Sequence, residues 1–242
     1  MDTRIEVIDK RLKNIRKIIA ISGGKGGIGK SSVSATLAAS LAKKGHKVGL
    51  LDLDFSGPST HIILGIRNYD FPKEDKGIIP SKYFGIKFMS IISFAGENPA
   101  PLRGIDISNA IIELLAITQW GSLDFLIIDM PPGIGDTTLD IIRTMKRVKF
   151  IMISTPSKLA FEIVKKSINL LLELKMPIIG IIENMKFSEN SSIKIQVEKY
   201  QLPFLGEIYF DKNLENAIGN IDKLYKTEFA EDLEKIIPKI FD

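Results

Sequence analysis

The sequence of 242 residues contains no cysteine, two histidines and one tryptophan. Without thiolates, the chain by itself holds no iron–sulfur cluster and no cysteine-ligated zinc ion, and it has no thiol nucleophile. Two histidines are too few to indicate a metal site of another kind. Apolar runs such as Phe125–Ile128 and Phe150–Ile153 have the length of a strand and are far too short to span a membrane.

Charge of one sign is not concentrated anywhere along the chain. Lysine and arginine number 33 against 29 aspartates and glutamates, which gives a formal net charge of +4. Because the lysines are scattered, this mildly basic balance is a weak indication of nucleic-acid binding. The N-terminus is rich in charge and lacks an apolar signal core, so we expect a cytoplasmic protein.

Short apolar runs alternate with longer amphipathic segments. This alternation predicts an α/β fold with a doubly wound, mostly parallel sheet flanked by helices. The predicted strands are Ile18–Ser22, Val48–Leu53, Ile86–Ile91, Phe125–Met130, Phe150–Ser154, Ile178–Ile182 and Phe204–Ile208. The predicted helices are Lys30–Lys43, Ile107–Thr118, Thr138–Lys146, Lys158–Leu174, Ile193–Tyr200, Leu214–Gly219 and Glu228–Ile240.

The N-terminal segment stands apart from this pattern. Ile5, Ile8, Leu12 and Ile15 recur at steps of three and four, which predicts an amphipathic helix over residues 1–16. Residues 17–242 then form a single domain. The helix packs on its own domain in one interpretation, and docks a partner protein in the other.

The strongest motif is Gly24-Lys25-Gly26-Gly27-Ile28-Gly29-Lys30-Ser31, between a predicted strand and a predicted helix. It fits the phosphate-binding loop G-x-x-x-x-G-K-[ST] in the required context. Its glycines let the backbone approach a polyphosphate, and the helix N-terminus adds its positive dipole end. Lys30 is expected to neutralise the β- and γ-phosphates, and Ser31 to ligate Mg²⁺. Ser32 supplies a further hydroxyl.

Carboxylates follow two of the predicted strands. Asp52 and Asp54 end the Val48–Leu53 segment on one face, and Asp129 ends an apolar strand in a Walker B pattern. Ligands bind at this edge of doubly wound sheets, so we expect Asp129 to hold Mg²⁺. One of the pair Asp52 and Asp54 could instead cap a helix. Gly133, after two prolines, is a candidate donor to the γ-phosphate.

The stretch Lys25–Ser31 resembles the deviant Walker A box of the Mrp/MinD/ParA ATPases. The resemblance implies that Lys25 reaches the nucleotide of a second subunit, so that ATP joins a homodimer. It also implies that Asp54 orients the attacking water and contributes to the metal site, and that Asn184 reads the adenine edge. The predicted catalytic residues are Lys25, Lys30 and Asp54, and the metal residues are Ser31, Asp54 and Asp129. The predicted residues for ATP or ADP are Gly24, Lys25, Gly26, Gly27, Ile28, Gly29, Lys30, Ser31, Ser32, Gly133 and Asn184.

Several stretches are similar to the Mrp branch of this family, among them Asp54–Ser59, Pro101–Gly104, Trp120–Asp136 and Glu183–Met185. The cluster-carrying members usually have a Cys-x-x-Cys pair after the last stretch, where this chain has Lys186–Ser192. A cysteine-free chain of this kind is similar to the archaeal HypB-type ATPases. That likeness implies nickel delivery to hydrogenase with a metallochaperone, docked through the N-terminal helix. The alternative is iron–sulfur cluster assembly with a partner's ligands.

Positioning ATPases of the MinD and ParA kind are the remaining alternative. MinD needs a basic amphipathic C-terminal helix to bind membrane, whereas the tail Lys226–Asp242 carries a net charge of about −2 and is interrupted by Pro238. The Asp-Pro-Gln-Gly stretch of ParA is absent at Asp54. We therefore expect neither membrane nor DNA binding.

Overall fold

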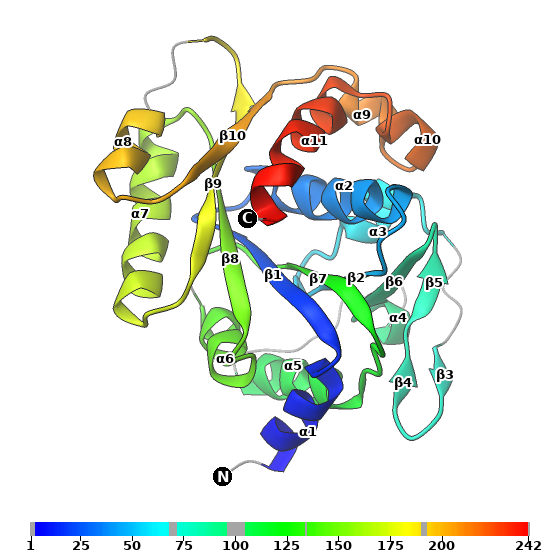
Figure 1. Cartoon of the computed structure of the whole chain (residues 1–242). Helices are drawn as coiled ribbons and strands as arrows, with labels where there is room; N and C mark the ends of the chain where they lie inside the picture. The colour runs from blue at the N-terminus through cyan, green and yellow to red at the C-terminus, as the bar shows by residue number, and fades with distance from the viewer. Residues whose placement is uncertain (1–2, 68–71, 96–104, 134, 190–192, 242) are drawn as a thin grey trace.

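The computed structural model describes residues 3–67, 72–95, 105–133, 135–189 and 193–241. Within them an eight-stranded sheet has the order β10-β9-β8-β1-β7-β2-β6-β5, parallel except for β5, which runs antiparallel to β6 (Figure 1). The strands are β1 (Ile15–Gly23), β2 (Val48–Asp52), β5 (Ser81–Tyr83), β6 (Ile86–Ser90), β7 (Leu123–Asp129), β8 (Val148–Ser154), β9 (Ile178–Lys186) and β10 (Phe204–Tyr209). The predicted fold class and all seven predicted strands are confirmed.

Helices cover both faces of the sheet. On one face, α2 and α11 pack on residues such as Ile19 and Ile21, and on the other, α1, α5, α6, α7 and α8 pack on residues such as Ile18 and Ala20 (Figure 1). The helices are α1 (Thr3–Leu12), α2 (Lys30–Lys43), α3 (Thr60–Leu64), α4 (Ile92–Ala95), α5 (Ile105–Ile117), α6 (Asp136–Thr144), α7 (Lys158–Glu173), α8 (Ile193–Lys199), α9 (Leu214–Ala217), α10 (Ile221–Leu224) and α11 (Glu228–Phe241). The double cover explains why the central strands are apolar on both sides.

The N-terminal helix is shorter than the sequence predicts. It ends at Leu12, and Ile15 already pairs with Leu123 in the sheet. The spacing of three residues between Leu12 and Ile15 fits the apolar face of a helix. In the structure, however, Ile15 pairs with β7 and therefore lies in a strand. Ile8 and Leu12 are buried in the same core cluster as α5. The apolar stripe therefore packs on its own chain, and this surface is not free to dock a partner.

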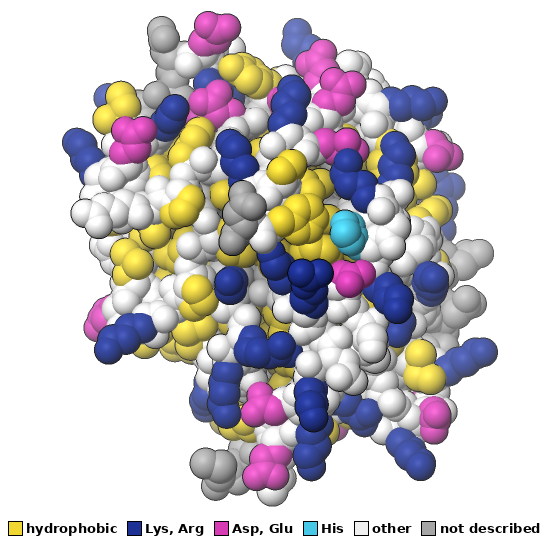
Figure 2. All heavy atoms as spheres, in the orientation of Figure 1, with side chains coloured by type: hydrophobic (Ala, Val, Ile, Leu, Met, Phe, Trp, Pro, Cys, Tyr) yellow, Lys and Arg dark blue, Asp and Glu magenta, His cyan; other side chains and the backbone are white. Residues whose placement is uncertain are grey.

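The C-terminal helix α11 is packed as well. Phe229, Leu233, Ile236 and Ile240 are buried against the sheet and α2, and Pro238 lies inside the helix without ending it. No helix among the described residues has the length and apolarity needed to cross a membrane. Figure 2 shows dark blue lysine and arginine side chains gathered below the end of this helix.

Short strands precede β6 in the chain. Residues 72–83 include a small antiparallel pair, β3 (Lys73–Glu74) and β4 (Ile78–Ile79), and the edge strand β5. The Mrp-like stretch Pro101–Gly104 lies outside the described residues.

Candidate nucleotide-binding site

The predicted phosphate loop lies between the end of β1 and the start of α2. Two of its glycines adopt left-handed backbone angles, with φ of 76° at Gly27 and 84° at Gly29, which only glycine adopts at little cost. A Cβ added at Gly26 or Gly27 would meet nothing within 4 Å. The backbone thus borders open space, and this space is a hollow of about 370 Å³ that Lys30, Ser31, Ser32 and Asp54 also line.

The Lys30 side chain lies within this loop. It is 6% exposed, and its Nζ donates to the carbonyl oxygen of Lys25 at 3.4 Å. Burial lowers the pKa of Lys30, while Asp129 and Asp54 act in the opposite direction. A buried ammonium with one weak neutral acceptor is poorly compensated, so an anion in the hollow would stabilise it.

Asp129 links the ends of β7 and β1 to α2. Its Oδ2 accepts a hydrogen bond from Ser31 Oγ at 2.6 Å, and its Oδ1 accepts one from Ser34 Oγ at 2.8 Å. Burial, together with the nearby Asp52 carboxylate, raises the pKa of Asp129 to about 7, although both serines and Lys30 lower it. The pair Ser31 and Asp129 therefore offers a hydroxyl and an under-compensated carboxylate of the kind that holds Mg²⁺.

Asp52 and Asp54 have different roles. Asp52 is buried and accepts hydrogen bonds from the backbone N–H groups of Ser59 and Thr60 at 3.2 Å and from Thr60 Oγ1 at 2.7 Å, so it caps the start of α3. Burial raises its pKa despite these bonds. Asp54 is half-buried and faces the hollow, and its Oδ1 accepts from the backbone of Ser56 and Gly57. Helix capping thus belongs to Asp52, and Asp54 lines the hollow beside the phosphate loop.

Three further predicted residues have distinct positions. Lys25 is exposed, and its side chain has no hydrogen bond or ion pair within the described part of the chain. Gly133 has a φ of 82°, and its N–H donates to the carbonyl oxygen of Gly23 at 3.2 Å. In this conformation that N–H is already used, so its bond to a phosphate stays a prediction. Gly24 is buried against Ile163 and Val164 of α7, which leaves no room for a side chain.

Asn184 lies at the other end of the loop. Its Nδ2 donates to the carbonyl oxygen of Ile28 at 2.9 Å, which fixes the orientation of the amide. Its Oδ1 is buried and has no partner. Asn184 lines a small hollow of about 50 Å³ together with Gly29, Ser32 and Phe210. A lone buried acceptor suits a ligand that donates there, such as the exocyclic amine of adenine.

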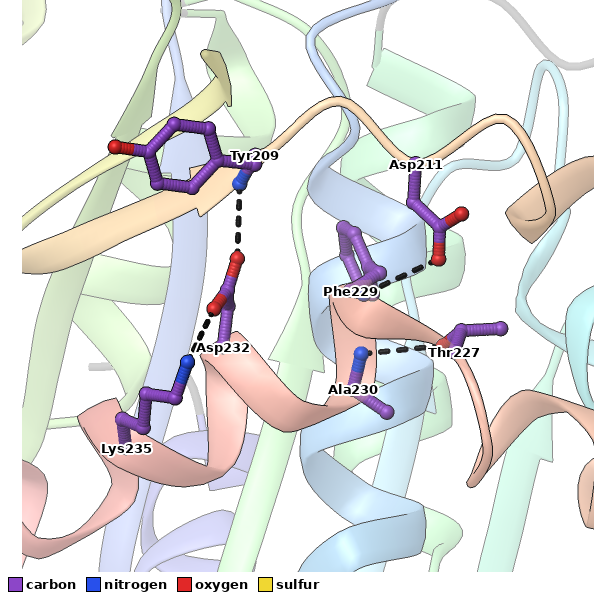
Figure 3. A network of polar contacts seen from close by, with 7 residues as sticks. All are labelled: Tyr209, Asp211, Thr227, Phe229, Ala230, Asp232 and Lys235. Atoms are coloured by element: carbon purple, nitrogen blue, oxygen red, sulfur yellow. Dashed lines mark hydrogen bonds and ion pairs between the residues drawn. The ribbon is translucent and has the colours of Figure 1, made fainter. Parts of the chain in front are cut away.

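The segment beside this hollow is anchored to the first turns of α11 (Figure 3). Asp211 Oδ2 accepts from the backbone N–H of Phe229 at 3.3 Å, and Asp232 Oδ2 accepts from that of Tyr209 at 3.1 Å. Asp232 also pairs with Lys235 at 2.8 Å. The sequence analysis did not identify these contacts, because they join carboxylates to backbone groups about 20 residues away.

Comparisons with known proteins identify the family of this chain. A family model described as the NUBPL iron-transfer P-loop NTPase matches residues 14–242. The chain belongs to this family. It is 40% identical over 210 residues to the iron-sulfur cluster carrier protein of Rickettsia bellii, covering 85% of this chain and 65% of that protein. It is 42% identical over 176 residues to the chloroplastic Fe-S cluster assembly factor HCF101 of Arabidopsis thaliana, covering 72% of this chain but 33% of that protein.

Solved structures show the same fold. A nucleotide-binding protein of Archaeoglobus fulgidus in complex with ADP superposes with a TM-score of 0.77 at 34% identity, over 91% of this chain and 92% of the other. The MinD cell division ATPase of Pyrococcus furiosus superposes with a TM-score of 0.69 at 20% identity, over 93% of this chain and 98% of the other. At this identity the similarity concerns the fold alone. The predicted Mrp/MinD-type P-loop fold is therefore confirmed. The relatives named here are an iron–sulfur cluster carrier and an Fe-S cluster assembly factor, and neither nickel delivery nor the HypB likeness gains support from them.

Gly29 gives a direct test of the loop geometry. A Cβ added there would collide with the Asn184 amide, and the backbone is left-handed. We expect Gly29→Ala to lower the free energy of unfolding by about 2 kcal/mol or more, measured by urea denaturation. Gly26→Ala, which adds a methyl group to open space, is the matched control and should unfold like the parent protein. Equal stability of the two variants would contradict this packing.

Proposed function

We propose that this chain is an ATP-hydrolysing switch that assists the transfer of iron–sulfur clusters held by a partner protein. The observation that carries the ATPase part is that Lys30 and Ser31 line one hollow beside the phosphate loop, with Asp129 hydrogen-bonded to Ser31 directly behind it. The unpartnered Oδ1 of Asn184 supports adenine as the base. The family and the printed names of the relatives support the iron–sulfur pathway.

The residues divide the work of hydrolysis between them. The loop N–H groups and Lys30 hold the phosphates, and Ser31 and Asp129 hold Mg²⁺, which supplies charge neutralisation when bound. Asp54 lines the same hollow and orients the attacking water. Fixed N–H groups and the lysine ammonium then stabilise the charge that develops in the transition state.

A homodimer formed around ATP completes the proposed site. Lys25 is exposed and its side chain makes no hydrogen bond or ion pair with the described residues, so it is available to a second subunit. Large apolar side chains lie exposed near the same edge of the sheet, namely Ile62 at 54%, Leu139 at 45% and Leu159 at 68%. They lie on α3, α6 and α7, each of which follows the carboxyl end of a strand. Exposed apolar side chains of this size are typical of surfaces that become buried on association.

The cluster ligands must come from elsewhere, because the sequence has no cysteine. The described residues also contain no group of three or more histidine, aspartate or glutamate side chains placed to hold a metal ion. This chain therefore supplies the ATP-dependent change of shape, and a partner supplies the thiolates.

A pull-down from native extract tests the pathway. With ATP and Mg²⁺ present, the captured partner should contain iron and acid-labile sulfide, and Lys30→Ala, as the control, should capture neither. Nickel without iron in the captured partner would contradict the iron–sulfur proposal while leaving the ATPase proposal intact. Anaerobic treatment of the chain alone with ferrous iron and sulfide should leave no bound cluster after desalting.

A further inference from the structure

Two serines of α2 contact the two oxygens of the Asp129 carboxylate. Ser31 Oγ donates to Asp129 Oδ2 at 2.6 Å, and Ser34 Oγ lies 2.8 Å from Asp129 Oδ1. Residues three apart in a helix lie on the same face, so both hydroxyls face the same carboxylate. Ser31 lines the hollow beside the phosphate loop, whereas Ser34 is fully buried and does not line it. Ser34 therefore does not touch a ligand in that hollow itself.

The sheet fixes the backbone of Asp129 and leaves only the rotation of its side chain open. Asp129 is in register with Ile21 of β1 on one side and with Asp52 of β2 on the other. Its carbonyl oxygen also accepts from the N–H of Leu53 at 3.0 Å. Because Asp129 is fully buried, bulk water does not compete for its carboxylate oxygens. The two serine hydroxyls are the hydrogen-bond donors that orient this carboxylate within the described part of the chain.

The Ser34 hydroxyl has one hydrogen and two acceptors within reach. Besides Asp129 Oδ1, its Oγ lies 2.9 Å from the carbonyl oxygen of Lys30, one turn earlier in α2. A serine inside a helix commonly donates to that carbonyl. A hydrogen bond to an ionised carboxylate is stronger than one to a neutral carbonyl. With Asp129 ionised, as a cation site requires, the hydrogen of Ser34 therefore belongs on Oδ1.

We propose that Ser34 is a positioning residue for the magnesium site, acting through Asp129 on Ser31. This inference rests on the proposed nucleotide site. While Ser34 holds Oδ1, Oδ2 accepts the hydrogen of the Ser31 hydroxyl, and the lone pairs of that hydroxyl stay open to the metal ion. Without Ser34, a buried carboxylate oxygen loses its donor. The carboxylate can then rotate toward Lys30, whose positive charge attracts it.

The magnesium dependence of ADP binding tests this role. The full chain is titrated with ADP by calorimetry, in EDTA and at a series of Mg²⁺ concentrations. Ser34→Ala should need at least about tenfold more Mg²⁺ to reach its full affinity for ADP, because loss of a residue that orients a metal ligand has an effect of this size. Its affinity in EDTA should stay within about twofold of the parent, since the loop N–H groups that hold phosphate are unchanged. An unchanged magnesium requirement, or an equal loss with and without Mg²⁺, would overturn the proposal.

Two further variants separate the hydrogen bond from shape and from general effects on α2. Ser34→Cys keeps a side chain of similar shape but donates weakly, so it should resemble Ser34→Ala. Parent behaviour of Ser34→Cys would overturn the proposal. Ser40 lies in the same helix and is also fully buried, and its Oγ has no hydrogen-bond partner among the residues that the structure describes. Ser40→Ala should keep the magnesium requirement of the parent, and a rise equal to that in Ser34→Ala would overturn the proposal.

The parent protein distinguishes failure of this inference from failure of the proposed function. If the parent binds no ADP at any Mg²⁺ concentration, the nucleotide site and the role of Ser34 are both overturned. If the parent binds ADP more tightly with Mg²⁺ and Ser34→Ala does so at the same Mg²⁺ concentration, only the role of Ser34 is overturned.

Discussion

Lys30→Ala is expected to lower the affinity for Mg·ATP by at least about 100-fold, the largest effect of any single substitution in this chain. The reason is the position of its ammonium, which is buried inside the phosphate loop with the Lys25 carbonyl oxygen at 3.4 Å as its hydrogen-bond acceptor. Removing it leaves the phosphates facing Asp129 and Asp54 without the intervening positive charge. Calorimetric titration with ATP and magnesium measures the loss.

Lys25→Ala is the matched control, since it removes a lysine from the same loop. Its side chain is exposed and belongs, in our proposal, to the partner's nucleotide. This variant should bind ATP as a monomer with near-parent affinity while losing ATP-dependent dimerisation in light scattering and most of its turnover. Parent affinity for Mg·ATP in Lys30→Ala would contradict the assignment of the phosphate site.

Asp54→Ala is expected to bind Mg·ATP but to hydrolyse it at least about 100-fold more slowly, and to accumulate as a dimer with trapped ATP. Asp54 lines the phosphate hollow but makes none of the hydrogen bonds that hold Ser31 or Lys30 in place. Phosphate release under saturating ATP gives the rate, and size-exclusion chromatography reports the trapped dimer.

The Asp54 carboxylate also has a structural contact that needs its own control. Its Oδ1 accepts from the N–H groups of Ser56 and Gly57, at 3.2 and 3.1 Å. Asp54→Asn keeps an oxygen in that place and so preserves the turn, but it removes the negative charge. If charge and water orientation matter, Asn should be nearly as slow as Ala. Recovery of parent turnover in Asp54→Asn would assign the residue to the turn instead.

The sequence predicts the central sheet well, because its buried strands are continuous apolar runs and its phosphate loop has a specific spacing. The shortest strands and helices cannot be predicted in this way. Strands of two or three residues, such as β3 (Lys73–Glu74), carry no periodic signal, and α3 begins because Asp52 caps it from eight residues away. The position of Ile15 in the sequence fits both the apolar face of a helix and a strand. Its pairing with Leu123 shows that it belongs to strand β1.

For the candidate site, sequence reasoning identifies residue types but not their partners. It predicts that Ser31 and Asp129 lie near one metal ion, and in the structure Ser31 Oγ and Asp129 Oδ2 are 2.6 Å apart. It does not reveal that Ser34 binds the same carboxylate, because a serine inside a helix has no distinguishing pattern. Nor does it show that Asn184 Nδ2 donates a hydrogen bond to the Ile28 carbonyl oxygen, while Asn184 Oδ1 has no partner. Such details depend on three-dimensional packing between segments that are 95 and 156 residues apart in the sequence.

The pairing of β2 with β7 places Asp52 and Asp129 opposite one another in register, so two buried carboxyl groups share one small region of low polarity. Like charges so close make simultaneous ionisation costly, and the Asp52 carboxylate, together with burial, raises the pKa of Asp129 to about 7. A divalent cation held at Asp129 would favour the ionised form, so its binding would release a proton to solvent. The affinity of this edge of the sheet for such a cation is therefore expected to weaken as the pH falls below about 7.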